Sequence, residues 1–237
     1  MSDFIVFEDR PTDSPWLERV WRCRSERAGD FTSMAASQWE MVVTRLRGDT
    51  TMTVRGPETF ATSARCPGEG EWLGIRFKLG TFLPQFPMAA ILDRNDAILT
   101  RLTTRSFRLN GASFEYPTFE NVETFVARLV RDGLLTRDPI VDSMRHGADP
   151  RTSERTAQRR FLRATGISHA AFTQIERARR ATELLRGGAP IVDAAHRAGY
   201  FDQAHLTRAV KRLIGKTPGQ IARGDSQLSF LYKTDAS

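Results

Sequence analysis

The stretch "GYFDQAHLTRAVKRLIGKTP" over residues 199–218 combines an aspartate, a histidine, two threonines and four cations. Asp202 and His205 are three residues apart and would share one face of a helix. Such a pair could act in catalysis, ligate a metal, or lie on a surface that binds an acidic partner. His205 has no second imidazole or thiolate at ligand spacing on its helix, which argues against a metal. Asp202 stands where a helix N-cap is expected.

Helices would position these residues. Apolar residues recur at three- and four-residue spacing after about residue 138, which is typical of amphipathic helices. Ser153 and Asp202 are N-cap types, and Gly166 can end a helix. Phe201 and Leu206 are spaced for a hydrophobic staple around the second cap. We expect helices over 138–147, 153–166, 168–188, 190–199 and 202–215.

Two of these helices have a polar face suited to DNA. Arginine can pair with both acceptors of guanine and glutamine suits adenine, as recognition in a major groove requires. A helical wheel places together Arg155, Gln158 and Arg159 in the first helix and Thr207, Arg208 and Lys211, with His205 at the edge, in the second. We expect phosphate contacts from Arg151, Arg160, Arg163 and Lys211.

The charge of the chain is uneven. Residues 1–150 carry 19 Lys and Arg against 21 Asp and Glu, whereas residues 151–237 carry 16 against 7. The formal surplus of +7 therefore comes from the last part of the chain. A basic module joined to a near-neutral one indicates a polyanion partner for that module, here double-stranded DNA. A solvated basic surface with no dedicated partner is the alternative.

The N-terminal half has a different periodicity. Gly74, Arg76 and Lys78 alternate with apolar residues, which is typical of a half-buried strand. An amphipathic helix follows Pro117 and ends near Gly133. This helix either links the halves and offers a dimer surface, or packs against its own sheet. Short stretches rich in β-branched and aromatic residues predict strands over 38–46, 50–56, 71–80 and 105–111.

The N-terminal half contains few residues that are suited to catalysis. All four histidines follow residue 145, so the predicted strands carry no imidazole to bind a catalytic metal. Cys23 and Cys66 have no CxxC spacing, and each is either a buried structural cysteine or a redox-sensing thiol. We expect no catalytic residue, no metal and no cofactor. The rival interpretation is a small-molecule enzyme or binding protein of the β half with an incidental basic helical tail.

The cellular compartment is predicted from three features. The start "MSDFIVFEDR" lacks the cationic region and long apolar run of a signal peptide. No apolar run approaches the roughly 20 residues of a membrane span. Two cysteines do not make a disulfide framework. We expect a soluble cytoplasmic protein with no membrane partner.

Spaced motifs run in order through residues 153–218. They are Ser-x-Arg-x-x-Gln-Arg-x-Phe from Ser153, Ala-x-x-Leu-Leu from Ala181, the block Ile191 to Tyr200, and Leu-x-Arg-x-x-Lys-x-x-x-Gly-x-Thr-Pro from Leu206. This pattern resembles the AraC/XylS family of bacterial transcription regulators. Two departures are Ala157, where leucine is usual, and the "GADP" interruption ahead of the first unit.

The resemblance implies roles for individual residues and partners. Base-facing roles fall on Arg155, Gln158 and Arg159, and on Gln203, His205, Thr207 and Arg208. The helical wheel places Gln203 nearer the buried side. The resemblance also implies RNA polymerase as a partner. It covers the N-terminal half more weakly, where family domains either sense a small molecule or mediate formation of a homodimer.

The expected fold is α+β, with a β-rich N-terminal regulatory domain and an all-α C-terminal domain of two helix-turn-helix units joined by a helix. The predicted boundaries are 1–116 for the regulatory domain, 117–137 for a linker helix, 138–225 for the tandem helix-turn-helix domain and 226–237 for a tail. The expected function is a sequence-specific DNA-binding transcription regulator, whose two recognition helices read adjacent major-groove segments.

Overall fold

The structure is a computed structural model that describes residues 5–93, 97–147 and 152–224. The chain divides into two compact units. The first comprises Met1–Gly29, Gln38–Pro57 and Cys66–His169, and the second comprises Asp30–Ser37, Glu58–Arg65 and Ala170–Ser237. Each unit therefore draws on separate stretches of sequence, and the domain boundaries given above remain a prediction.

The first unit is built on an antiparallel sheet, which confirms the β-rich N-terminal prediction. The expected strands 38–46, 50–56 and 71–80 overlap β4 (Glu40–Leu46), β5 (Asp49–Arg55) and β7 (Gly70–Phe77). The turn between β4 and β5 has positive φ at Arg47 and Gly48, a backbone suited to a tight hairpin. In spatial order the strands are β1 (Ile5–Arg10), β2 (Leu17–Ser25), β7 (Gly70–Phe77), β4 (Glu40–Leu46), β5 (Asp49–Arg55) and β9 (Ala97–Ile98).

Strand β7 lies between β2 and β4, and both of its faces are buried over Leu73–Phe77. Arg76 is only 7% exposed, and its guanidinium lies 3.5 Å from the Glu40 carboxylate. Trp21 packs over Gly74 and donates its indole N–H to the same carboxylate at 3.2 Å. The expectation of a half-buried strand is therefore wrong at Arg76. The charge is accommodated inside because Glu40 pairs with it, whereas an isolated buried charge would be strongly unfavourable.

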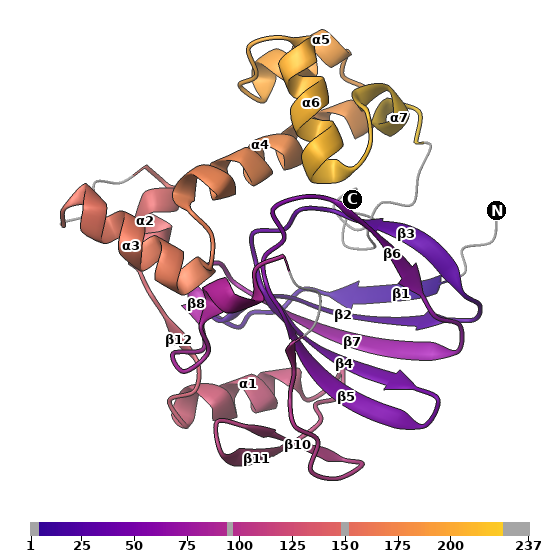
Figure 1. The fold of residues 1–237 in the computed structure, drawn as a ribbon, viewed down its shortest axis with the longest axis vertical. Helices are drawn as coiled ribbons and strands as arrows, with labels where there is room; N and C mark the ends of the chain where they lie inside the picture. The colour runs from indigo at the N-terminus through magenta and orange to yellow at the C-terminus, as the bar shows by residue number, and fades with distance from the viewer. Residues whose placement is uncertain (1–4, 94–96, 148–151, 225–237) are drawn as a thin grey trace. The chain divides into compact units, whose positions relative to one another are not determined.

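The expected helix after Pro117 is α1 (Val122–Arg131), and its apolar face packs on the chain's own hairpin of β10 (Ser106–Leu109) and β11 (Ala112–Glu115) (Figure 1). The Phe125 ring lies edge-on to Phe107 and Phe114, with centroids 6.2 and 6.0 Å apart. On the other side, Arg10 of β1 pairs with both carboxylate oxygens of Glu123 at 2.6 and 2.8 Å. These contacts fix α1 within the first unit.

The first helix pair, α2 (Ile140–Arg145) and α3 (Glu154–Thr165), also belongs to the first unit. Ser153 caps α3, as expected, because its hydroxyl accepts a hydrogen bond from the Thr156 amide. α3 packs on a 3-10 turn, η1 (Met88–Ile91), and on β8 (Thr81–Phe82), which pairs with β12 (Thr136–Arg137). Gly166 ends α3 so close to Met88 that a Cβ would lie 2.9 Å from the Met88 carbonyl oxygen.

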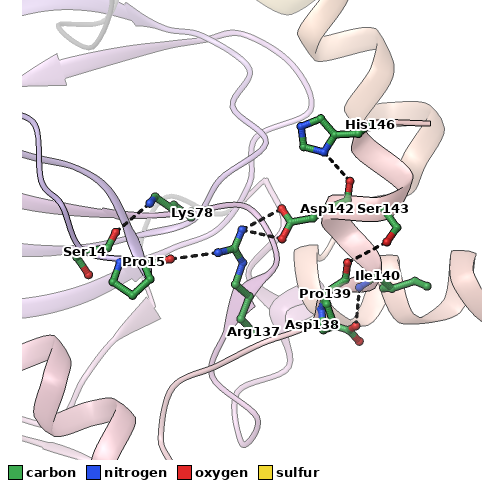
Figure 2. Close-up of polar contacts among 10 residues, drawn as sticks. All are labelled: Ser14, Pro15, Lys78, Arg137, Asp138, Pro139, Ile140, Asp142, Ser143 and His146. Atoms are coloured by element: carbon green, nitrogen blue, oxygen red, sulfur yellow. Dashed lines mark hydrogen bonds and ion pairs between the residues drawn. The ribbon is translucent and has the colours of Figure 1, made fainter. Parts of the chain in front are cut away.

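Arg137 joins the start of this helix pair to the β-rich part of the unit (Figure 2). One of its terminal nitrogens donates to the Pro15 carbonyl at 3.2 Å, and the other donates to both Asp142 oxygens at 2.9 and 2.8 Å. Lys78 donates to the Ser14 carbonyl at 2.9 Å. The segment around residues 14–15 is therefore tied to the residue that follows β7 and, through Arg137, to α2.

The second unit contains the remaining helices, α4 (His169–Arg186), α5 (Ile191–Arg197), α6 (Gln203–Ile214) and α7 (Pro218–Ala222). It also includes most of two strands from the front of the chain, β3 (Gly29–Ser33) and β6 (Thr62–Cys66), which pair with each other. The helix α7 was not expected; a capping box between Thr217 and Gln220 starts it. Among the described helices, none is long and apolar enough to cross a membrane.

Candidate nucleic-acid interface

Helix α6 has one buried and one exposed face. Asp202 caps its N-terminus, as expected, because the carboxylate accepts a hydrogen bond from the His205 amide at 2.6 Å. The buried residues are Leu206, Val210, Leu213 and Ile214. Of the predicted DNA-facing residues, Gln203, Arg208 and Lys211 are exposed, and His205 and Thr207 are half-buried. Gln203 therefore lies on the exposed side of the helix.

Arg177 of α4 holds the turn that leads into α6. Its Nε donates to the Ala198 carbonyl at 3.2 Å, and a terminal nitrogen donates to the Gly199 carbonyl. The guanidinium also lies 4.5 Å from the centre of the Tyr200 ring. Tyr200 in turn meets the His205 imidazole edge-on at 5.1 Å. A chain of contacts thus runs from α4 to a predicted base-facing residue.

The expected hydrophobic staple is wrong. Phe201 is 87% exposed, whereas Leu206 is fully buried, so the two side chains do not cover one another. Tyr200, only 3% exposed, takes the buried position beside α6 instead. Burial raises the pKa of its phenol. The anchor of the turn is therefore one residue earlier than the sequence pattern indicates.

Helix α3 presents a second polar face, within the first unit. Arg155, Gln158 and Arg159 are all exposed, while Ala157 and Phe161 are buried on the opposite side. The Gln158 amide donates to the Glu154 carboxylate at 2.9 Å. A base contact by Gln158 would replace this bond. The small side chain of Ala157, where the family usually has leucine, is 1% exposed in the packed core.

The predicted phosphate contacts have different surroundings. Arg160 makes a bidentate ion pair with Asp138, in which its Nε and a terminal nitrogen donate to the two carboxylate oxygens at 3.0 and 2.5 Å. This pairing raises the pKa of the guanidinium. Arg163 is exposed and lies 5.7 Å from the centre of the Phe82 ring. Lys211 is exposed on α6, and Arg151 lies outside the described residues. Arg160 would have to leave or share Asp138 to bind a phosphate.

A further exposed cation of α6 is not among the residues predicted from the sequence. Arg212 is exposed on α6, one turn after Arg208. Its four-residue spacing from Arg208 was the available signal, because residues four apart are neighbours on a helix surface. Arg212 is suited to a phosphate contact beside Arg208.

The described residues contain no group of His, Cys, Asp and Glu that could hold a metal ion. Both cysteines are buried and form no disulfide. Burial raises the pKa of Cys23 to about 12 and also raises that of Cys66. Such thiols carry little thiolate at neutral pH, and the thiolate is the reactive form. The structure thus favours a structural role for both.

Comparisons with known proteins point to the helical part of the chain. Residues 150–224 match a family model described as a helix-turn-helix domain. Over 74 residues the chain is 35% identical to the regulatory protein ada of Salmonella typhimurium, and this alignment covers 31% of the chain and 21% of that protein. The chain therefore spans about a fifth of the length of the curated relative that it matches.

Similar solved structures include two of ToxT from Vibrio cholerae. Their TM-scores are 0.40 and 0.41 at 9% and 10% identity, with 94% of this chain and 99% and 98% of those chains covered. At these scores the likeness supports no conclusion about function or domain arrangement. The ordered motifs of residues 153–218 and the family match over the same segment agree with one another. Residues 150–224 therefore carry a helix-turn-helix domain, and their motifs resemble those of the AraC/XylS family of regulators.

Proposed function

We propose that the protein is a sequence-specific DNA-binding transcription regulator in which α3 and α6 are the recognition helices. Each helix would enter one of two major-groove segments about one turn, ~10 bp, apart. The β-rich unit would control this binding, through either a small molecule or formation of a homodimer. RNA polymerase as a second partner is supported by the family resemblance alone.

The observation that carries the proposal is the exposed polar face on each of two capped helices. Arg155 and Arg159 of α3 and Arg208 of α6 are exposed arginines on helices whose opposite faces are buried. Arginine in this setting can reach both acceptors of a guanine. The high content of Lys and Arg after residue 150 supplies the electrostatic attraction to phosphates.

The binding experiment uses the full chain. Double-stranded DNA selected from a random library should show two conserved blocks separated by about one helical turn, ~10 bp. A footprint that protects a single groove segment per protomer would contradict the use of two recognition helices. Affinity should fall steeply as salt is raised, because cationic side chains displace counterions from the phosphates. Binding that is indifferent to salt would contradict the basic-face argument.

A pair of variants on α3 separates base contacts from phosphate contacts. Arg159→Ala should cost about 1–3 kcal/mol at the preferred site and relax the base preference there. Arg163→Ala is the matched control on the same helix, and it should weaken all sequences alike. Competition binding with selected and scrambled DNA measures both effects. If the two variants lose affinity uniformly, the assignment of these two arginines is wrong.

The control function of the β-rich unit needs its own measurement. A small-molecule ligand that binds the folded protein raises its apparent unfolding temperature by mass action. A thermal-shift screen against metabolites, run beside sedimentation at several protein concentrations, tests the effector and the homodimer separately. A ligand that raises the melting temperature and changes DNA affinity would support control by an effector.

A further inference from the structure

The C-terminal end of α6 is capped by two segments from the front of the chain. The Ala35 amide donates to the Leu213 carbonyl at 2.8 Å, and the Ala61 amide donates to the Arg212 carbonyl at 2.9 Å. These carbonyls belong to the last turn of α6, where helix geometry provides no intrahelical donor. The segments Asp30–Ser37 and Glu58–Arg65, here called the ribbon, therefore complete the hydrogen bonding of this helix within the second unit.

The ribbon also fits closely around the residue that ends α6. Gly215 has a φ of +81°, and a Cβ there would lie 2.7 Å from Thr32 Cγ2 and 3.1 Å from Ala61 Cβ. A side chain at this position would force Thr32 and Ala61 of the ribbon to shift, because Cβ atoms essentially never lie within 3.0 Å of another atom. Glycine is thus required at residue 215 both for its backbone conformation and for the contact.

The ribbon is held together and attached to the helices at other points as well. Ala36 and Glu58 form a β-bridge between its two segments, and the Ser33 hydroxyl donates to the Glu58 carboxylate at 2.8 Å. The Ser37 hydroxyl donates to Glu176 of α4 at 3.2 Å. The ribbon therefore contacts both the connecting helix and the predicted recognition helix of the second unit.

We propose that the ribbon is a positioning element of the second helix-turn-helix unit: it sets the orientation of α6 and so decides how Arg208 and its neighbours meet the bases. Each segment of the ribbon is continuous in sequence with strands of the first unit at both of its ends. A change in those strands can therefore reach α6 along the backbone. The effect of the ribbon on base recognition rests on the proposed DNA-binding function. The docking of the ribbon on α6 does not depend on that function.

A glycine pair provides the matched test. Gly215→Ala adds a methyl group against the ribbon, and it also strains a backbone of positive φ. Gly188→Ala adds the same methyl group at a φ of +82°, where nothing lies within 4 Å of the new atom. Both variants carry the backbone strain, and only the first displaces the ribbon. Thr32→Ser, combined with Gly215→Ala, removes the closest contacting atom and should partly restore the fit.

The first measurement needs no DNA. Amide hydrogen exchange resolved at Ala35 and Ala61 should show protection in the wild-type chain. Exchange at both amides should become roughly threefold to tenfold faster in Gly215→Ala, as loss of one net hydrogen bond implies. It should be unchanged in Gly188→Ala and partly recovered by Thr32→Ser. Unprotected amides in the wild type, or equal exchange in the two glycine variants, would overturn the docking.

The second measurement uses double-stranded DNA selected by the wild-type chain from a random library. Gly215→Ala should change the base preference in the block read by α6 and leave the other block unaltered, which a general loss of stability would not do. Uniform weakening across both blocks would overturn the positioning role. If the wild type selects no DNA sequence, the proposed function and the effect of the ribbon on base recognition are both wrong. The exchange data still decide whether the ribbon docks on α6.

Discussion

Replacing Arg177 with alanine removes the contacts that hold the turn between α5 and α6. The side chain makes hydrogen bonds to the Ala198 and Gly199 carbonyls and lies over the Tyr200 ring. Tyr200 is 3% exposed and contacts His205 of α6, so the guanidinium is linked through the Tyr200 ring to the first turn of α6. We expect Arg177→Ala to loosen this turn and to reduce DNA affinity.

The magnitude follows from the contacts and their exposure. Hydrogen bonds to a charged group contribute about 1.5–3 kcal/mol when buried, and a cation–π contact at an exposed site adds about 0.5–1 kcal/mol. Arg177 is half-buried, so solvent weakens both contributions. We therefore expect a loss of about 2 kcal/mol in the free energy of unfolding, which corresponds to roughly a thirtyfold change in an equilibrium constant.

Arg180→Ala is the matched control. Arg180 is exposed on the same helix, and its substitution removes the same charge. Urea unfolding of both variants measures stability, and competition binding to selected DNA measures affinity. The control should stay within about 0.5 kcal/mol of the wild type, as surface substitutions usually do. Equal losses in the two variants would refute the reasoning, because removal of charge alone would then account for the effect.

The Arg10 guanidinium lowers the pKa of Glu123 from 4.5 to about 2, so the carboxylate adds stability that is fully present above pH 4.5 and is lost as pH falls toward 2. Because 41% of the Glu123 side chain is exposed, Glu123→Gln should lower the free energy of unfolding by only about 1 kcal/mol at pH 7. Urea unfolding should show the difference between wild type and variant narrowing below pH 4.5, and a constant difference would contradict this reasoning. Because the pKa of Cys23 is raised, iodoacetamide at pH 8 should modify this thiol only after the protein unfolds. Mass spectrometry measures the modification, and rapid alkylation of Cys23 in the native protein would contradict the prediction. Asp138→Asn should release Arg160 for a phosphate and steepen the salt dependence of DNA binding by about one unit of slope. An unaltered slope would argue that Arg160 has only a structural role.

Local sequence signals predicted the helical elements well. Ser153 and Asp202 act as N-caps, and Gly166 and Gly215 end α3 and α6 in the left-handed conformation. These features depend on neighbouring residues and on glycine's conformational freedom, so the chain specifies them locally. The exposed positions of Arg155, Gln158, Arg159 and Arg208 follow from helical periodicity alone.

Features that depend on distant partners were not predictable in the same way. The alternating pattern of its strand predicts an exposed side chain for Arg76. The side chain is buried instead, because it pairs with Glu40 on a neighbouring strand. Arg160 has the type and place of a phosphate contact, and Asp138 engages it. The periodicity of a strand or helix describes its faces and says nothing about which element covers them. The two segments of the ribbon are short, and no local pattern assigns them to α6.

The hydrogen bond between Ala35 and Leu213 also bears on how the chain folds. It joins residues near opposite ends of the sequence, and contacts of such high sequence separation form slowly because a long loop must close first. On the ribosome, β3 and β6 emerge long before α6, so the ribbon must wait for most of the chain to be synthesised. During that interval its strand edges are available to other chains. We therefore expect newly made protein to be most vulnerable to aggregation before residues 203–215 appear.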